Sequence, residues 1–342
     1  MTIWQAAFHL AERVPIPDVL TRRAIDTLVD RTSRRLATAE ADATARFVEE
    51  LERFPIAVHA ERANEQHYEV PAAFYDAVLG PQRKYSCCYY DGPLVTLADA
   101  EARALALTGE HARLVDGQSI LELGCGWGSL SIWMAQAYPR SRIVAVSNSH
   151  SQRAFIMRKA TDLQLNNLEV VTADMNEFSV DRRFDRIVSV EMFEHMANWR
   201  QLLTRCRRWL KPDGRMFVHV FTHSTTPYRF DHADKQDWIA QYFFTGGCMP
   251  SRALIRAFPD VLEVESEWYW EGTHYARTAR DWLTNFDENN AAVTEALAVT
   301  YGPEASTWHR RWRLFFLATA GLFGFDNGRE WGVSHYLLKL PS

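Results

Sequence analysis

Two carboxylates and an imidazole lie close together after residue 190, and side chains of these types can attract a cation and accept its proton. Glu191, Glu194 and His195 follow residues 184–190, an apolar run that is predicted to be a buried strand. Ionisable groups are costly to bury without a task, and a cluster of them at a strand end is typical of a catalytic site. A solvated surface cluster is the alternative. We favour catalysis because the three groups occur together.

A glycine-rich turn supplies the second chemical signal. Residues 119–123 form a short apolar run, after which glycines fall at every second position, at Gly124, Gly126 and Gly128, before a segment of helical period. This order brings backbone close to a nucleotide at a helix N-terminus. The dinucleotide motif requires a wider second gap, and Glu122 would repel phosphate but suits a cation. S-adenosylmethionine (SAM), an adenosine with a sulfonium and no phosphate, is therefore the predicted cofactor. A turn without a ligand is the alternative.

Polar residues also follow the next two predicted strands. Asn148 stands where nucleotide-binding folds usually place an acid for the ribose hydroxyls, so it is our candidate for that role. Gln152 either contacts the ligand or forms a helix-capping box with Ser149. Asp174 is expected to meet the adenine amino group and the Met175 backbone a ring nitrogen, while a helix N-cap is the alternative for Asp174.

The elements that must position these residues alternate between strand and helix from residue 112 to about 222. Alternation at this spacing predicts an α/β fold with a doubly wound, mostly parallel, Rossmann-like sheet. Ligands of such sheets bind at the carboxyl ends of the strands, where all of these groups lie. The predicted strands are residues 119–123, 142–147, 168–172, 184–190 and 215–221, the last after a turn at 211–214, and the predicted helices are 129–137, 151–163 and 199–210.

The chain divides into three predicted parts. Residues 1–70 form an N-terminal helical segment, 71–222 the SAM-binding core, and 223–342 a substrate cap with C-terminal strands that complete the sheet. Helices are expected over 19–36 and 39–53. The first is basic and amphipathic and could lie on a membrane, but its aspartates dilute the charge, so we favour packing on the core.

Composition excludes several classes of protein. The 342 residues are 47% hydrophobic and 24% charged with a net charge of −5, which predicts a globular protein without a nucleic-acid footprint. Five cysteines show no metal-ligand spacing, so we expect no metal and a reducing, cytoplasmic location. The N-terminus lacks a signal-peptide pattern, and no apolar run reaches the ~20 residues that span a bilayer. Abundant aromatic residues in the C-terminal half suit an aromatic-walled pocket.

These motifs resemble those of plant coclaurine, tetrahydroprotoberberine and pavine N-methyltransferases, which belong to the cyclopropane-fatty-acid-synthase-like branch of the class I SAM-dependent methyltransferases. The resemblance extends from about residue 68 to 340, and the first 60 residues match only loosely. Its motifs are KYSCCY at 84–89, LELGCGWGSL at 121–130, NSxxQ at 148–152, DRI at 185–187, EMFEHM at 191–196, FVH at 217–219, YFFTGG at 242–247, MPS at 249–251, HY at 274–275, LFG at 322–324 and EW at 330–331.

The resemblance implies roles for individual residues. Glu194 and His195, helped by Glu191, would serve an amine substrate, and S-adenosylhomocysteine (SAH) would be the second product. The residues implied around SAM are Tyr85, Ser86, Gly124, Asn148, Gln152, Asp174 and Met175. The predicted substrate pocket contains Cys87, His219, Tyr242, Phe243, Tyr275 and Trp331.

The cyclopropane branch of the family leaves a second function open. It holds a bicarbonate with residues that match Cys87, Glu194, His219 and Tyr275, all retained here. Two departures argue against that branch: it usually has glycine in place of Glu191, and it carries a late cysteine that residues 317–325 lack.

The predicted function is therefore SAM-dependent N-methylation of a cyclic or aromatic amine of the tetrahydroisoquinoline type. Such an amine has a pKa near ~10 and arrives as a cation. Glu191 or Glu194 would attract it, and Glu194 or His195 would accept its proton. Methylene or methyl transfer to an unsaturated lipid and a non-catalytic SAM-binding protein are the alternatives. We expect a small-molecule partner, no nucleic acid and no membrane contact, with a homodimer left open.

Overall fold

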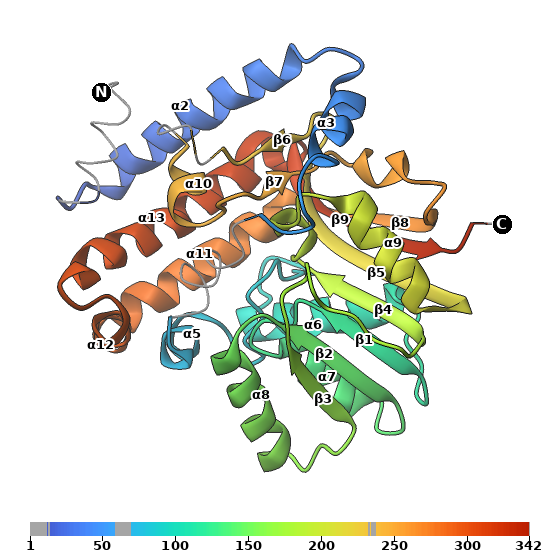
Figure 1. Cartoon of the computed structure of the whole chain (residues 1–342). Coiled ribbons are helices and arrows are strands. Elements are labelled where there is room, and N and C mark those ends of the chain that lie inside the picture. The colour runs from blue at the N-terminus through green and yellow to red at the C-terminus, as the bar shows by residue number, and fades with distance from the viewer. Residues whose placement is uncertain (1–11, 13, 59–69, 232, 234–236, 342) are drawn as a thin grey trace.

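A seven-stranded sheet runs through the centre of the protein (Figure 1). The computed structural model describes residues 12, 14–58, 70–231, 233 and 237–341. The strand order is β3-β2-β1-β4-β5-β9-β8, and β9 is antiparallel to both neighbours. This confirms the predicted doubly wound, mostly parallel α/β fold. The strands are β1 (Ser119–Leu123), β2 (Arg142–Ser147), β3 (Leu168–Thr172), β4 (Phe184–Val190), β5 (Leu210–His223), β8 (Glu263–Glu271) and β9 (Trp331–Lys339), and a separate pair is formed by β6 (Tyr228–Arg229) and β7 (Cys248–Met249).

Helices cover both faces of the sheet because successive side chains of each strand point to opposite faces. In β1, Ile120 belongs to one apolar core and Leu121 to the other. The helices are α2 (Asp18–Ala37), α3 (Ala43–Leu51), α5 (Ala72–Val78), α6 (Leu97–His111), α7 (Ser129–Ala137), α8 (His150–Asp162), α9 (Trp199–Trp209), α10 (Trp238–Tyr242), α11 (Gly272–Glu288), α12 (Asn290–Tyr301) and α13 (Ala305–Gly324).

The predicted element boundaries fit the first four strands and differ at β5. The turn expected at 211–214 is wrong as a strand boundary, since β5 already begins at Leu210. Its pairing with β4 jumps from Leu210 to Arg215, so the intervening residues are taken up as an irregularity within the strand. The sequence Lys-Pro-Asp-Gly at 211–214, which favours a turn, therefore forms a bulge within β5.

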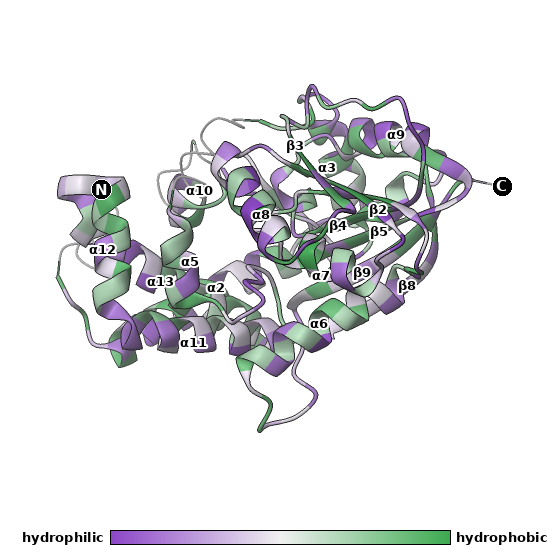
Figure 2. Ribbon diagram, turned by 90° about the horizontal axis from the view of Figure 1, so that it is seen from below, coloured by the Kyte–Doolittle hydropathy of each residue, from purple (hydrophilic) through white to green (hydrophobic). Residues whose placement is uncertain are grey.

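The C-terminal helices α11, α12 and α13 form a layer beside the sheet, and α2 lies along α13 (Figure 1). Helix α2 buries Ile25, Val29 and Leu36, and an Arg313 nitrogen lies 2.6 Å from an Asp18 carboxylate oxygen. This bears out the interpretation that the basic helix packs on the core. The described residues form no helix long and apolar enough to cross a membrane. In Figure 2 the helices show both hydrophilic and hydrophobic colours along their length, as in α8, which buries one face and exposes the other.

Candidate active site

Two adjoining cavities lie at the carboxyl ends of β1 to β4. The larger encloses about 1060 Å³ including its open mouth, and the smaller about 680 Å³. They meet at shared lining residues, so they form one continuous site. The shared residues are Gly124, Gly126, Gln152, Met192 and His195.

The three glycines of the turn have different tasks, although all have positive φ, which side chains adopt only with strain. A Cβ on Gly124 would lie 2.6 Å from the Met192 side chain, and one on Gly128 would lie 2.6 Å from Ile156. A Cβ on Gly126 would meet nothing within 4 Å, because it would point into the cavities. Gly128 lines neither cavity, in contrast to its predicted cofactor contact, and allows α7 to approach α8.

Glu122 is a buried acid in the wall of the larger cavity. Its carboxylate accepts a hydrogen bond from the Ser131 hydroxyl, and burial raises its pKa to about 7. A buried carboxylate with one neutral donor favours a cationic neighbour. This agrees with the prediction from the sequence that the ligand at the glycine turn carries a positive charge and no phosphate.

The smaller cavity gathers the polar residues predicted for the nucleoside. Asn148, Asp174 and Met175 line it, and Gln152 lines both cavities. The capping box is only half formed: the Ser149 hydroxyl accepts the Gln152 N–H, but the Gln152 side chain accepts a hydrogen bond from Ser147 at 2.6 Å. One Asp174 oxygen accepts the N–H of Asn176 at 2.7 Å, so this residue also caps a local turn.

The run at residues 84–89 forms one wall of the larger cavity. Tyr85 and Ser86 line it, as predicted from the resemblance. Lys84 lines it as well, although its side chain is buried and donates from Nζ to the Ser86 hydroxyl and the Cys87 carbonyl, both at 2.6 Å. Sequence reasoning missed this lysine, because a lysine is ordinarily expected in solvent.

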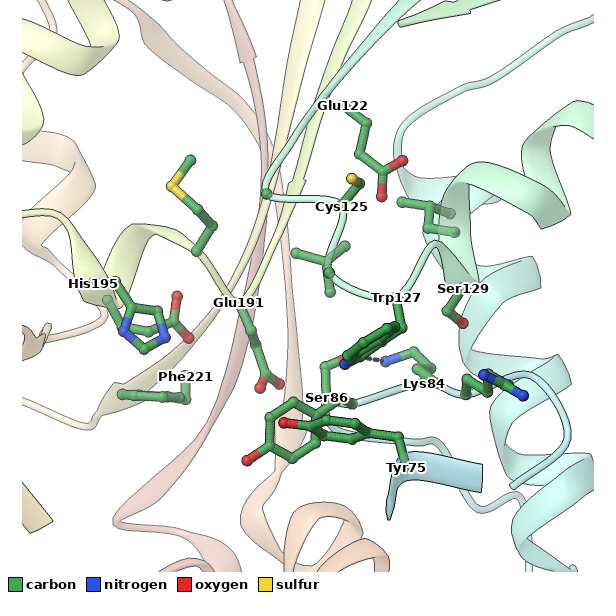
Figure 3. A pocket seen from close by; sticks show the side chains of 18 of the residues that line it. Tyr75, Lys84, Ser86, Glu122, Cys125, Trp127, Ser129, Glu191, His195 and Phe221 are labelled. Carbon is green, nitrogen blue, oxygen red and sulfur yellow. Dashed lines mark hydrogen bonds between the residues drawn. The ribbon is translucent and has the colours of Figure 1, made fainter. Parts of the chain in front are cut away.

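Glu191 extends from the end of β4 into the space between His195 and Trp127 (Figure 3). Its carboxylate accepts hydrogen bonds from the Cys87 N–H at 2.8 Å and the Tyr275 hydroxyl at 2.6 Å, and lies 3.1 Å from His219 Nε2. Burial raises the pKa of Glu191, and the charge of Lys84 opposes that rise. Glu191 has φ 46°, a conformation that glycine adopts readily.

A row of histidines stands behind Glu191. His219 Nδ1 lies 2.8 Å from His335 Nε2, and His335 Nδ1 lies 2.8 Å from His111 Nδ1. Residues 219 and 335 are paired across β5 and β9, and Trp268, paired with His335 on β8, stacks on the His111 ring. Burial lowers the pKa of all three rings, that of His111 to about 4, so they are neutral near pH 7. A neutral His219 serves Glu191 as a hydrogen-bond donor without adding charge.

Glu194 is the opposite of Glu191 in its contacts. It is fully buried and lines the larger cavity, yet neither carboxylate oxygen has a hydrogen-bond partner among the described residues. Burial, followed by repulsion from Glu191, raises its pKa well above the ordinary value. His195 lines both cavities with its ring stacked on Phe244, at 4.9 Å between ring centres.

The structure divides the predicted substrate-pocket residues into three groups. Tyr275 lines the larger cavity, and Cys87 and His219 lie behind it in contact with Glu191. The remaining three line neither cavity. Tyr242 packs under the guanidinium of Arg311, Phe243 stacks on Phe315 in the core, and Trp331 contacts Phe325 and donates to the Tyr228 hydroxyl.

The aromatic walls of the larger cavity were predicted as a class, and of their residues only Tyr85 and Tyr275 were named in advance. The aromatic surplus was the available signal, but the phase of each helix and loop, which decides which ring faces inward, is set by packing. Phe244 lines the cavity, for example, while its neighbours Tyr242 and Phe243 do not. The aromatic lining residues that were missed are Tyr75, Trp127, Phe221, Phe244, Trp282 and Phe315.

The chain belongs to the family described as mycolic acid cyclopropane synthetase, whose model matches residues 57–327. It is similar to an (S)-coclaurine N-methyltransferase of Thalictrum flavum subsp. glaucum, with 38% identity over 294 residues, 84% of this chain and 81% of that protein. The cyclopropane-fatty-acyl-phospholipid synthase of Escherichia coli (strain K12) is 29% identical over 270 residues, 78% of this chain and 66% of that protein.

A solved structure gives the same result. The crystal structure of coclaurine N-methyltransferase bound to N-methylheliamine and SAH has a TM-score of 0.93 and 32% identity, and the match covers 98% of this chain and 99% of that one. Together these comparisons confirm the resemblance predicted from the sequence motifs.

The bare carboxylate of Glu194 predicts a pH-dependent stability. Its raised pKa means that the folded protein holds this proton above pH 4.5, where the unfolded chain loses it, so stability falls as pH rises. We expect Glu194→Gln to be more stable than the parent protein by about 1–3 kcal/mol at pH 8, with the difference vanishing near pH 4. Urea unfolding without ligand measures it. Exposed Glu288→Gln is the control, and equal stabilities at every pH would contradict the prediction.

Proposed function

We propose that this protein is a SAM-dependent N-methyltransferase that acts on a cyclic or aromatic amine of the tetrahydroisoquinoline type. The observation that carries the proposal is the Glu194 carboxylate, which is buried without a hydrogen-bond partner among the described residues, in an aromatic-walled cavity that opens to the glycine turn. An ammonium ion is the partner that such a carboxylate lacks. The similarity to the plant N-methyltransferases supports the same function.

The residues around the two cavities fit SAM. Asn148, Asp174 and Met175 would hold the nucleoside in the smaller cavity, with Gln152 between the cavities. The amino-acid part would pass the open face of Gly126 toward the larger cavity. Glu122, Tyr85 and Ser86 lie there as polar partners. Bound SAM would supply a methyl group that an uncharged amine nitrogen attacks in line.

The chain has its own tasks in this reaction. An amine with a pKa near ~10 arrives protonated, so the cavity must attract the cation, remove a proton and aim the lone pair. Glu194 can do the first two, because its carboxylate lines the cavity without a hydrogen-bond partner among the described residues. His195, on the stack with Phe244 at the junction of the cavities, is a second acceptor, directly or through water. The aromatic walls hold the substrate ring and align it.

The three parts of the chain divide this work in the proposal. Residues 71–222 would bind SAM and 223–342 would complete the substrate cavity, while α2 and α3 of the N-terminal segment pack against that C-terminal part. The partner is a small-molecule amine, and the location we propose is the cytoplasm, in keeping with five buried cysteines that are all free thiols.

Transfer to an unsaturated lipid is the second candidate, because the chain retains the residues that match a bicarbonate site in the cyclopropane branch. The contacts of Glu191 argue against it. Its carboxylate occupies donors from Cys87, His219 and Tyr275, which an added anion would otherwise use. A bicarbonate there would meet like charge.

Cofactor binding is tested at Gly126. We expect Gly126→Val to abolish SAH binding in calorimetry, because its side chain would fill space that is open in the structure. The matched control is Gly117→Val, since Gly117 also has positive φ and open space but is exposed and lines neither cavity. NAD should bind weakly or not at all. Normal SAH binding by Gly126→Val would show that the cofactor lies elsewhere.

Amine methylation is tested at the carboxylate and the imidazole. We expect Glu194→Ala and His195→Ala each to lower turnover by roughly 10²-fold and to leave SAH affinity nearly unchanged. Activity of the parent enzyme should rise from about pH 6 to 8, as amine and base lose protons. Turnover of a panel of cyclic amines with labelled SAM measures both effects, with His309→Gln as the control. Full activity of both alanine variants would remove these residues from the mechanism.

The two candidate functions are separated at Glu191. We expect bicarbonate depletion to leave amine turnover unaffected and unsaturated phospholipid vesicles to remain unalkylated. Glu191→Gly should lower amine turnover by about tenfold or more, and bicarbonate should partly restore it by filling the freed donors. Because Glu191 has φ 46°, glycine fits its backbone.

Glu191→Gln is the control for this rescue, since its side chain still fills the space beside the three donors. Methylene transfer from SAM to phospholipid by the parent enzyme, stimulated by bicarbonate, would overturn the amine assignment. In that case Glu191→Gly should improve the transfer.

A further inference from the structure

Lys84 is a charged group in the active site that the mechanism above leaves without a task. Its side chain is only 2% exposed, and it lines the larger cavity with Tyr85, Ser86 and Glu191. Burial of an ammonium group is costly unless charges or hydrogen bonds compensate it. The presence of Lys84 in this cavity therefore requires a compensating partner.

The direct partners of the ammonium group are neutral. Lys84 Nζ donates to the Ser86 hydroxyl and to the Cys87 carbonyl, both at 2.6 Å. Figure 3 shows Lys84 and Ser86 close together on the side of the pocket toward Trp127. These two bonds hold the ammonium group against the 86–87 backbone. They occupy two of its three donors and do not compensate its charge.

The compensating negative charge is that of Glu191, which is connected to Lys84 through the backbone of Cys87. The Cys87 N–H donates to Glu191 Oε1 at 2.8 Å, so the residue whose carbonyl accepts from Lys84 also donates to the carboxylate. A second acid, Glu101, accepts the backbone N–H of Lys84 at 3.2 Å on the far side of the run. Lys84 thus lies between two buried acids, and among the described residues it forms no direct ion pair with either of them.

The other groups around Glu191 carry no positive charge near neutral pH. They are the Tyr275 hydroxyl, the thiol and N–H of Cys87, the His219 ring and the acid Glu194. Burial keeps the His219 ring neutral, as it does His335 behind it. Arg83 also lines this cavity, but its guanidinium pairs with Asp76 and lies over the Phe155 ring. Of the described cations, Lys84 is the one whose charge offsets the burial of Glu191.

We propose that Lys84 is a positioning residue for amine binding: its buried ammonium group keeps Glu191 negatively charged beside Glu194 and holds the Cys87 N–H on Glu191. The inference rests on the proposed amine methyltransferase function and adds a specificity determinant to it. Two adjacent buried acids without a nearby cation would both retain protons, and an uncharged cavity would not select an ammonium ion. With Lys84 present, the pair releases a proton at lower pH and the cavity is ready for a cationic amine.

The consequence is a pH-dependent affinity whose sign follows from the charges. Loss of Lys84 raises the pKa of Glu191, so at neutral pH more of this carboxylate is protonated and a cation binds more weakly. Raising the pH ionises the acids in the variant as well. The variant, in addition, has no Lys84 charge to repel a cationic ligand. The difference in affinity should therefore close, or even reverse, as pH rises.

The test measures binding rather than turnover, with Lys84→Met as the variant because methionine keeps much of the length of lysine without its charge. The probe is the fixed cation N,N-dimethyltetrahydroisoquinolinium, whose charge does not change with pH, and the neutral analogue tetrahydronaphthalene is the matched ligand. Calorimetry is done in the presence of SAH between about pH 6 and pH 9. We expect Lys84→Met to bind the cation about tenfold more weakly at pH 6–7 and comparably at pH 9. The neutral ligand should bind the same at every pH.

Lys159→Met is the control, because it removes the same charge from an exposed position on α8. An equal loss of affinity for the cation and the neutral ligand, or a loss that persists at pH 9, would mean that Lys84 only shapes the cavity and would overturn the proposal. Unchanged cation affinity at pH 6–7 would overturn it as well. If the affinities of the parent protein and Lys84→Met differ with pH as expected but the parent methylates no amine, the proposed function is contradicted and the role of Lys84 in cation binding stands.

Discussion

The burial of two neighbouring carboxylates at the end of β4 is the constraint on which the rest of the site depends. Ionised acids in a protein interior need partners, and the two acids here receive very different ones. Glu191 is surrounded by donors from three elements, namely the run at 84–89, β5 and α11. Glu194 receives none among the described residues. The carboxylate of Glu191 is therefore held by hydrogen bonds within the protein, whereas that of Glu194 is available to a ligand.

The antiparallel strand β9 is what allows this arrangement. It inserts between β5 and β8, so that His335 lies directly beside His219 and Trp268 directly beside His335. Helix α6 then places the His111 ring on Trp268, and the row of rings reaches from Glu191 to a half-buried position. Because burial keeps these rings neutral, the row orders the donor to Glu191 without cancelling the negative charge of the cavity.

The same contacts give a physical account of how one family could serve two kinds of substrate. A lipid-alkylating site would need a mobile base such as bicarbonate held by neutral donors. In this chain the side chain of Glu191 occupies the donors from Cys87, His219 and Tyr275. The anion is thus covalently part of the protein, and together with Glu194 it gives the cavity a charge that suits an ammonium ion and not an alkene. In the proposed function, Glu191, at a backbone position that also suits glycine, is one of the residues that separate the two chemistries.

The sequence alone determined most of the local elements and indicated the principal candidates for the chemistry. The apolar runs marked β1 to β4 because buried parallel strands have few polar residues, and the glycine turn and the acids after β4 marked the site because such types and spacings are costly elsewhere. The sequence could not show that Gly128 serves helix packing, that Phe244 and not Phe243 lines the cavity, or that Lys84 is buried beside Glu191. Those facts depend on strand register, helix phase and contacts between residues up to about two hundred positions apart, such as Tyr275 and Glu191 or Cys88 and Thr278. Only the tertiary structure decides them, because side-chain periodicity specifies which residues share a face of an element but not which element packs against that face.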